Sequence, residues 1–185
     1  MLKSLTFTQD WRCFKAGDDF EFRPGVNLVV GDQGCGKSSL LETIKDAGTK
    51  NKGKRAVVVT DGACTSLYFD FEKGNPRTLS YFGDDIKGQV QMMFSSHGES
   101  VKAILKALDQ ASDGVLAMLD EPDSALSIRS CMKLVAQFKN LEQRGVQVIA
   151  AVHNPVVIQA FDTVYSLEHR LWMPGSEFTG IHLEG

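Results

Sequence analysis

The sequence has no apolar run that is long enough to cross a bilayer as a helix, which takes roughly 18–20 residues. Its longest apolar stretches, Val115–Leu119 and Val146–Val152, have the length of buried strands. The first ten residues also lack the charged head and apolar stretch of a signal peptide. We therefore expect a cytoplasmic protein that has no membrane partner.

Cysteine is scarce, and so is excess positive charge. The chain has four cysteines, none of them in a CxxC pair, so neither a zinc motif nor a disulfide framework is indicated. The formal net charge is −3, whereas proteins that bind duplex phosphate are usually basic. Composition therefore gives no sign of a nucleic-acid partner, although it leaves room for a local basic patch.

The chain has the size and composition of one globular domain. It contains 185 residues, of which 43% are hydrophobic and 23% are charged. No internal repeat, low-complexity segment or linker divides it. We therefore treat residues 1–185 as a single domain.

Short apolar runs alternate with segments of helical periodicity. The runs predict an N-terminal hairpin with a polar turn at Ala16–Asp19, followed by strands at Val26–Val30, Ala56–Thr60, Leu67–Phe71, Val115–Leu119, Val146–Val152 and Thr163–Leu167. Helices are predicted at Lys37–Ala47, Glu99–Gln110 and Ile128–Arg144, with a short one from Pro155. Buried strands that alternate with helices indicate an α/β fold with a mainly parallel sheet.

The segment from Gly31 to Ser38 reads Gly-Asp-Gln-Gly-Cys-Gly-Lys-Ser and fits the P-loop pattern. It lies between a predicted buried strand and a predicted helix, which is the context the motif requires. The glycines let backbone N–H groups surround phosphate, and the helix N-terminus adds favourable partial charge. Lys37 can reach the β- and γ-phosphates, and the Ser38 hydroxyl can hold Mg²⁺.

Two carboxylates end the predicted strand at Val115–Leu119. Asp120 can hold Mg²⁺, and Glu121 can act as general base by polarising the attacking water. Acidic residues at a strand end are weak evidence for catalysis by themselves, but the P-loop earlier in the chain strengthens this interpretation. His153 follows the next buried strand and is expected beside the phosphate edge of the sheet, although a lone histidine there is more often structural.

In their order, these motifs resemble those of the ATP-binding-cassette (ABC) ATPases. The chain looks most like the soluble branch that includes the SMC, RecF and RecN heads, and within it like small stand-alone ATPases of bacteria and phages. Residues 10–27 resemble that branch's N-terminal hairpin, and 31–38 resemble its Walker A motif. Residues 119–122 fit Walker B, 124–127 fit the D-loop, and His153 fits the switch histidine.

The resemblance extends to the signature motif of the family, LSGGQ. In the segment Ser95–Glu99, Ser96 and Gly98 match its serine and second glycine, whereas His97 and Glu99 are departures. In the family this motif contacts ATP bound to the other subunit, which implies a nucleotide-dependent homodimer. The alternative is that a serine here only caps the following helix.

The resemblance implies ATP and Mg²⁺ as ligands, with Ser38 and Asp120 on the metal and Glu121 and His153 as catalytic residues. It places the following residues at the nucleotide: Arg12, Gly31, Gln33, Gly34, Cys35, Gly36, Lys37, Ser38, Ser39, Ser96 and Gly98.

Several assignments stay open. Residues 73–112 leave room only for a reduced helical arm, and no clear Q-loop glutamine is found. Asp70 and Glu72 could act as polar ligands, but solvation at a strand edge is the preferred interpretation. Arg12 is either a nucleotide contact or an exposed side chain, and Trp11 or Phe14 either stacks on adenine or belongs to the core.

The run Lys50–Arg55 is the single basic cluster of the sequence. A solvated loop is the default interpretation, and a contact with a nucleic-acid backbone is the alternative.

The function that we expect is Mg-dependent ATP hydrolysis, linked to DNA repair or to phage–host processes. A transporter subunit and a poorly hydrolysing switch for an unidentified effector protein are the alternatives, and the reduced arm argues against transport.

Overall fold

A computed structural model describes residues 1–47, 55–71, 108, 111 and 113–183. The predicted arm at 73–112 and the basic run Lys50–Arg55 therefore lie almost wholly outside the described residues. Ser96 and Gly98 also lie outside them, as does nearly all of the predicted helix Glu99–Gln110.

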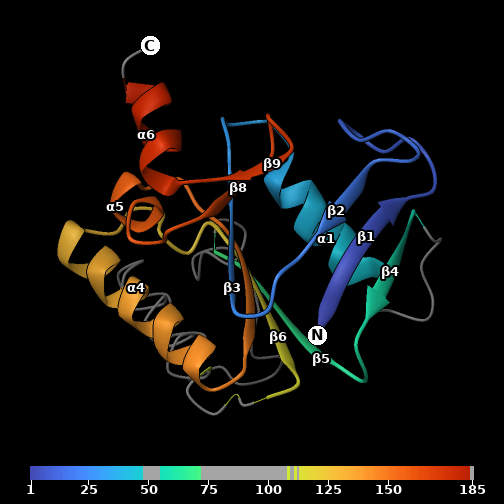
Figure 1. Ribbon diagram of the computed structural model, residues 1–185, viewed down its shortest axis with the longest axis horizontal. Helices are drawn as coiled ribbons and strands as arrows, with labels where there is room; N and C mark the ends of the chain where they lie inside the picture. Colours follow the sequence, from blue (N-terminus) through green and yellow to red (C-terminus); the bar gives the residue numbers. More distant parts are fainter. Residues whose placement is uncertain (48–54, 72–107, 109–110, 112, 184–185) are drawn as a thin grey trace, which may run out of the picture.

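A six-stranded sheet forms the centre of the molecule (Figure 1). Its strand order is β5-β6-β7-β3-β8-β9. The strands are β3 (Val26–Val30), β5 (Thr65–Asp70), β6 (Val115–Asp120), β7 (Gln147–Ala151), β8 (Val164–Ser166) and β9 (Leu171–Met173). Neighbouring strands are parallel except β8 and β9, so the predicted mainly parallel sheet is confirmed.

A smaller antiparallel sheet, in the order β2-β1-β4, lies to one side, on the right of Figure 1. It consists of β1 (Leu2–Phe7), β2 (Asp19–Glu21) and β4 (Ala56–Thr60). The antiparallel pairing of β1 with β2 confirms the predicted N-terminal hairpin. The polar turn is one residue shorter than predicted, because Asp19 already pairs with Thr6.

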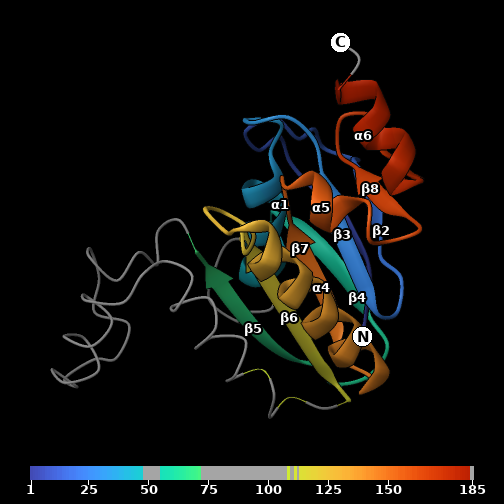
Figure 2. The ribbon, with the colours of Figure 1, turned by 90° about the vertical axis from the view of Figure 1, so that its left-hand side faces the viewer.

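Helices cover both faces of the central sheet, as Figure 2 shows for α4 on one side and α1 on the other. Helix α1 (Lys37–Ala47) lies between the two sheets, where it contacts β4, β6 and β7. Helix α4 (Ile128–Gln143) begins at Ser127, whose side chain accepts a hydrogen bond from the Ser130 N–H. Both helices confirm the sequence prediction within one residue.

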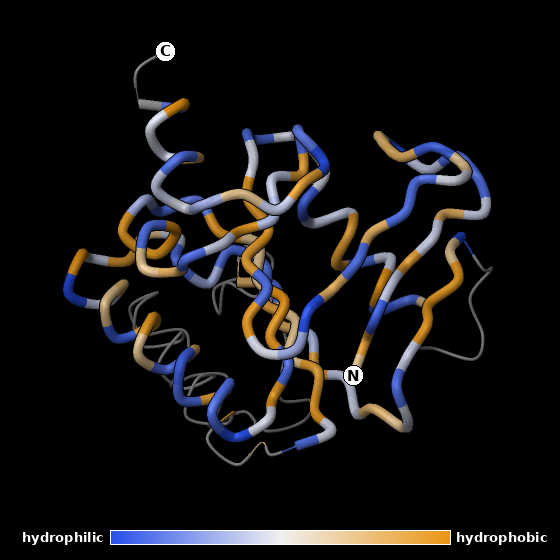
Figure 3. Tube along the Cα trace, in the orientation of Figure 1, coloured by the Kyte–Doolittle hydropathy of each residue, from blue (hydrophilic) through white to orange (hydrophobic). Residues whose placement is uncertain are grey.

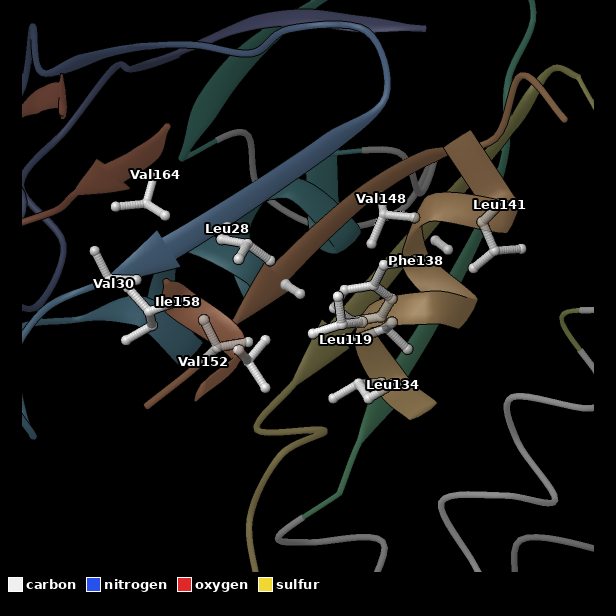
Figure 4. Close-up of a cluster of buried hydrophobic side chains, with 14 of the residues drawn as sticks. Leu28, Val30, Leu119, Leu134, Phe138, Leu141, Val148, Val152, Ile158 and Val164 are labelled. Atoms are coloured by element: carbon white, nitrogen blue, oxygen red, sulfur yellow. The ribbon is translucent and has the colours of Figure 1, made fainter. Parts of the chain in front are cut away.

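Alternating side chains of each strand supply two separate cores. In β3, Leu28 and Val30 point to the α4 side, where they pack with Phe138, while Val29 packs with Leu40 on the α1 side. Figure 4 shows the first of these cores, and Figure 3 shows the apolar central strands that feed both. The result is a sheet whose two faces are both covered by apolar side chains.

The C-terminal part was not predicted. After α5 (Pro155–Ile158) and β8, the chain adds β9 and the helix α6 (Gly175–Leu183), although the sequence pattern ended at Leu167. Helix α6, red in Figure 1, stands at the same end of the molecule as the loop between β3 and α1. Among the described residues, no helix is both long and apolar enough to span a membrane.

Candidate functional site

The P-loop connects β3 to α1 and curls around the ammonium group of its own lysine. Lys37 Nζ donates to the carbonyls of Gly31 at 2.7 Å and Asp32 at 2.9 Å, and the residue is only 5% exposed. Gly34 and Gly36 have φ angles of 86° and 109°, which L-residues with side chains rarely adopt. Glycine at these positions therefore allows the tight loop that an anion-binding cradle needs.

The N-terminal hairpin leaves no room for a side chain at position 36. A Cβ atom there would lie 2.3 Å from Cys13 Sγ and 3.2 Å from the Phe14 ring. The loop and the N-terminal hairpin thus pack directly against each other. Phe14 itself is 2% exposed and stacks on Phe7, so it belongs to the core and is not placed to stack on a base.

Ser38 and Asp120 meet across the carboxyl edge of the sheet. Ser38 Oγ donates to Asp120 Oδ1 at 3.0 Å, and Tyr68 Oη donates to Asp120 Oδ2 at 3.3 Å. Burial raises the pKa of Asp120 to about 6; nearby Asp70 and Glu121 add to the rise, and the Ser38 hydrogen bond opposes it. Buried carboxylate charge beside a hydroxyl suits a hard divalent cation, so these residues fit Mg²⁺.

Asp70 is nearer to this centre than the sequence indicated. It ends β5 in register with Asp120 at the end of β6, and it is only 8% exposed. The expectation of solvation at a strand edge is therefore wrong for Asp70. Pairing of β5 with β6, which sequence periodicity cannot reveal, brings the two carboxylates to one edge.

Glu121 and His153 lie at the ends of neighbouring strands and face each other. His153 Nε2 is 2.9 Å from Glu121 Oε1, while the Glu121 N–H donates to the Ala151 carbonyl at 3.0 Å. Glu121 has a φ of 55°, an uncommon conformation for a non-glycine residue. The turn after β6 thus directs this side chain toward the histidine that follows β7.

Asp123 fixes the backbone of that histidine. Its Oδ2 atom accepts the N–H groups of His153 at 2.8 Å and Asn154 at 2.5 Å, and the residue is 3% exposed. Burial raises the pKa of Asp123, and the two backbone hydrogen bonds oppose that rise. No sequence motif marks Asp123 for this role, because the role depends on a contact between two loops.

Arg12 reaches the first turn of α1. Its Nη1 atom lies 2.7 Å from Ser39 Oγ and 2.9 Å from a carboxylate oxygen of Glu42. Arg12 is therefore not a free exposed side chain, because it is anchored beside the helix that follows the P-loop.

The Arg55 guanidinium lies over the Trp11 ring, 3.7 Å from the ring centre, and also approaches the Asp46 carboxylate at 3.5 Å. That end of the basic run is therefore held against the protein.

Two adjoining cavities join these groups. One, of about 140 Å³, is lined by Lys37, Ser38 and Ser39 of the P-loop together with Glu121 and His153. The other, of about 380 Å³, extends past the same glutamate and histidine to the predicted D-loop at Ser124. Most of the predicted site residues among those described are thus brought to one open cleft.

The fold is that of an ABC-type P-loop ATPase. CbiO1 from Clostridium perfringens, part of the ABC transporter complex cbiONQ, is similar with a TM-score of 0.63 at 14% identity, covering 97% of this chain and 91% of that chain. UvrA2 from Deinococcus radiodurans is similar at 0.63 and 14%, covering 88% and 34%. A nucleotide-free ATP-binding cassette from an ABC transporter gives 0.55 and 13%, covering 100% and 96%.

A comparison of the sequence with protein-family models identifies the family of this chain. A family model described as an AAA domain matches residues 8–147, more than half of the chain, and the chain belongs to this family. No curated protein sequence matches the chain. The P-loop and the fold together support nucleotide binding.

Proposed function

We propose that this chain binds ATP with Mg²⁺ and hydrolyses it to ADP and phosphate. The observation that carries the proposal is one cleft lined by Lys37, Ser38, Glu121 and His153, in which Ser38 is hydrogen-bonded to the buried Asp120 and Glu121 contacts His153. A phosphate cradle, a cation-binding pair and a polarisable base are the parts that phosphoryl transfer to water requires.

Each group has a distinct task. The P-loop N–H groups and Lys37 bind the β- and γ-phosphates, with Gln33 and Ser39 at the rim of the cleft. Mg²⁺ at Ser38 and Asp120 would neutralise charge on the phosphate oxygens. Glu121 orients the attacking water and accepts its proton, and His153 contacts the γ-phosphate. Because little covalent chemistry is needed, catalysis rests on positioning and charge.

The binding step is tested with Lys37→Ala in isothermal titration calorimetry with ATP. A hydrogen bond between charged groups, such as Lys37 to phosphate, contributes about 1.5–3 kcal/mol. Its loss should therefore weaken ATP binding roughly 10- to 100-fold. Lys133→Ala, which changes an exposed lysine on α4, is the matched control and should bind like the wild type. Equal affinity of the Lys37→Ala and Lys133→Ala variants would overturn the assignment of the P-loop.

The active form in this proposal is an ATP-dependent homodimer. One chain has a single P-loop and a single signature-like segment at Ser96 and Gly98, so two copies related by a two-fold axis would complete two sites. ATP that contacts both chains would bind the dimer more tightly than the monomer and would shift the equilibrium toward the dimer by mass action. Light scattering of Glu121→Gln with Mg-ATP should show a dimer, and Ser96→Arg should prevent it. A monomer at saturating ATP would contradict homodimerisation and indicate a different partner.

For the biological role, we propose a member of the SMC, RecF and RecN branch that acts in DNA repair or in a phage–host process. The N-terminal hairpin packed against the P-loop supports this placement. The second candidate is a nucleotide-binding subunit of a transporter, favoured by the likeness to transporter cassettes. Co-purification with a hydrophobic membrane protein would reverse this order, whereas capture of a water-soluble effector would support the first role.

A further inference from the structure

A second group of potential ligands lies beside the P-loop, and the ATPase proposal does not use it. Asp32 comes from the P-loop, Glu168 from the turn between β8 and β9, and His182 from α6. His182 Nε2 is 3.5 Å from Glu168 Oε2 and 3.9 Å from Asp32 Oδ1, and one ligand atom from each lies within 4.8 Å of the others. Three separate segments thus direct one nitrogen and two oxygens to a common point.

When the His182 ring is neutral, its hydrogen bonding leaves this point without a donor. Its Nδ1 atom is 2.9 Å from the Phe178 carbonyl, which can only accept, so Nδ1 carries a proton. In the neutral ring, Nε2 then carries a lone pair, which faces two carboxylates. Histidines that bind metals usually donate their other ring N–H to a carbonyl or carboxylate in this way. The Phe178 ring, stacked at 4.2 Å, also fixes the orientation of the imidazole.

The carboxylates are positioned in a similar way. Glu168 Oε1 accepts the Asp32 N–H at 2.7 Å, which leaves Oε2 to face His182. The turn that carries Glu168 is tied down by Arg170, which forms a two-pronged ion pair with Asp18. The His182 and Glu168 side chains are 28% and 27% exposed, so the Glu168 charge is partly desolvated, whereas the Asp32 side chain is 77% exposed. A cavity of about 230 Å³, lined partly by Asp32 and His182, gives access and room for a water ligand.

We propose that Asp32, Glu168 and His182 bind a divalent transition-metal ion of the zinc class. Imidazole nitrogen with carboxylate oxygen is a ligand set that Zn²⁺ accepts, and a water molecule would complete four-coordination. Mg²⁺ prefers oxygen ligands in an octahedron, so this site differs from the Ser38–Asp120 pair in the ion it selects. The cation supplies the positive charge that the three acceptors lack.

The position of the site couples it to the nucleotide cleft. The Asp32 carbonyl accepts a hydrogen bond from Lys37, so a metal on the Asp32 side chain would restrain the loop that holds the phosphate-binding lysine. It would also fasten α6 to that loop. Any effect of zinc on nucleotide affinity must equal the effect of nucleotide on zinc affinity, because binding linkage is reciprocal.

The test is calorimetric titration of Zn²⁺ into the full-length, nucleotide-free, reduced chain. One ion should bind per chain, and His182→Ala should weaken binding by at least about tenfold. His153→Ala is the control, because His153 borders the same cavity but is paired with Glu121, and its loss should leave zinc affinity unchanged. Equal affinity of wild type and His182→Ala, or loss in His153→Ala alone, would overturn the proposal, as would no binding at all.

Two further readouts separate ligation from misfolding and from thiol binding. Zinc at about 100 times its wild-type dissociation constant should raise the melting temperature of the wild type by about 5–10 °C, and that of Glu168→Gln by clearly less. X-ray absorption at the zinc edge should show nitrogen or oxygen at about 2.0–2.1 Å. A sulfur shell at about 2.3 Å would assign the metal to cysteine and overturn the site.

Discussion

Two histidine–carboxylate groups flank the P-loop, and they have similar chemistry in different surroundings. At the first, His153 lies 2.9 Å from Glu121 in the cleft that contains Lys37 and Ser38. At the second, His182 lies 3.5 Å from Glu168 beside a cavity that is walled partly by Ile158 and is also bordered by His153. The side chains of the two pairs are between 24% and 37% exposed, whereas Asp32 of the second group is 77% exposed. What surrounds a histidine–carboxylate pair, more than the pair itself, decides what it can bind.

The two histidines are also held by different atoms. Asp123 holds His153 through the backbone N–H, and Phe178 holds His182 through ring atom Nδ1. A fixed tautomer suits a metal ligand, which must present one lone pair. Backbone anchoring suits a residue whose ring meets a phosphate that arrives and leaves with each turnover.

The largest effect is expected for Glu121→Gln, which retains size and hydrogen bonding but removes the base. Steady-state ATP hydrolysis should fall about 10²- to 10⁴-fold while ATP binding persists. Glu177→Gln, an exposed glutamate on α6, is the matched control and should retain the wild-type rate. Hydrolysis by Glu121→Gln at the wild-type rate would show that another group is the base.

His153→Ala should lower turnover by about 10²- to 10³-fold, as expected when a contact to the transferring phosphoryl group is removed. The control is His169→Ala, because His169 contacts Ser166 and lies in neither group. The two variants are compared in the same phosphate-release assay. If both lose activity equally, the cleft histidine has no special role.

Asp123→Ala should lower turnover by up to about 100-fold, because it releases the backbone that positions His153. Two partly buried N–H groups lose their acceptor, so urea unfolding should show a loss of about 1–3 kcal/mol. Asp123→Asn keeps an acceptor oxygen and should recover most of kcat with KM unchanged. Loss of stability without loss of kcat would reduce Asp123 to a structural role.

The smallest effect is expected at the turn that carries Glu168. The Arg170 hydrogen bond holds the pKa of Asp18 below its ordinary value, so the charged form contributes stability above the unfolded pKa of about 4. That contribution is lost as the pH falls through the lowered folded pKa. Asp18→Asn should cost no more than about 1 kcal/mol in urea unfolding at pH 7, and the difference should shrink toward pH 3. A constant difference across this range would rule out the ion pair as its source.

The sequence predicted the central strands and the P-loop well, for physical reasons. Parallel strands buried on both faces are near-continuous apolar runs, and Val115–Leu119 and Val146–Val152 were located from this property within two residues. The P-loop needs glycine and lysine at fixed spacing, so its chemistry is written in local order.

What the sequence did not predict depends on contacts between distant segments. Helix α6 contains Gly175 and Gly180, which are poor helix formers, and docking decides its conformation. A Cβ at Gly175 would lie 2.3 Å from the Ile158 carbonyl, so glycine permits this close packing. Burial of Asp70 follows from strand pairing, and the His182 group has no sequence spacing that marks it.

Both ATP hydrolysis and the shared site can be tested by measuring phosphate release from Mg-ATP at a series of wild-type protein concentrations, with Lys37→Ala as the background. We expect release well above that background. It also predicts a rate per molecule that rises with protein concentration and then levels off, because two copies complete each site. Release no faster than with Lys37→Ala would contradict ATP hydrolysis, and a rate per molecule independent of concentration would contradict a site shared between two chains.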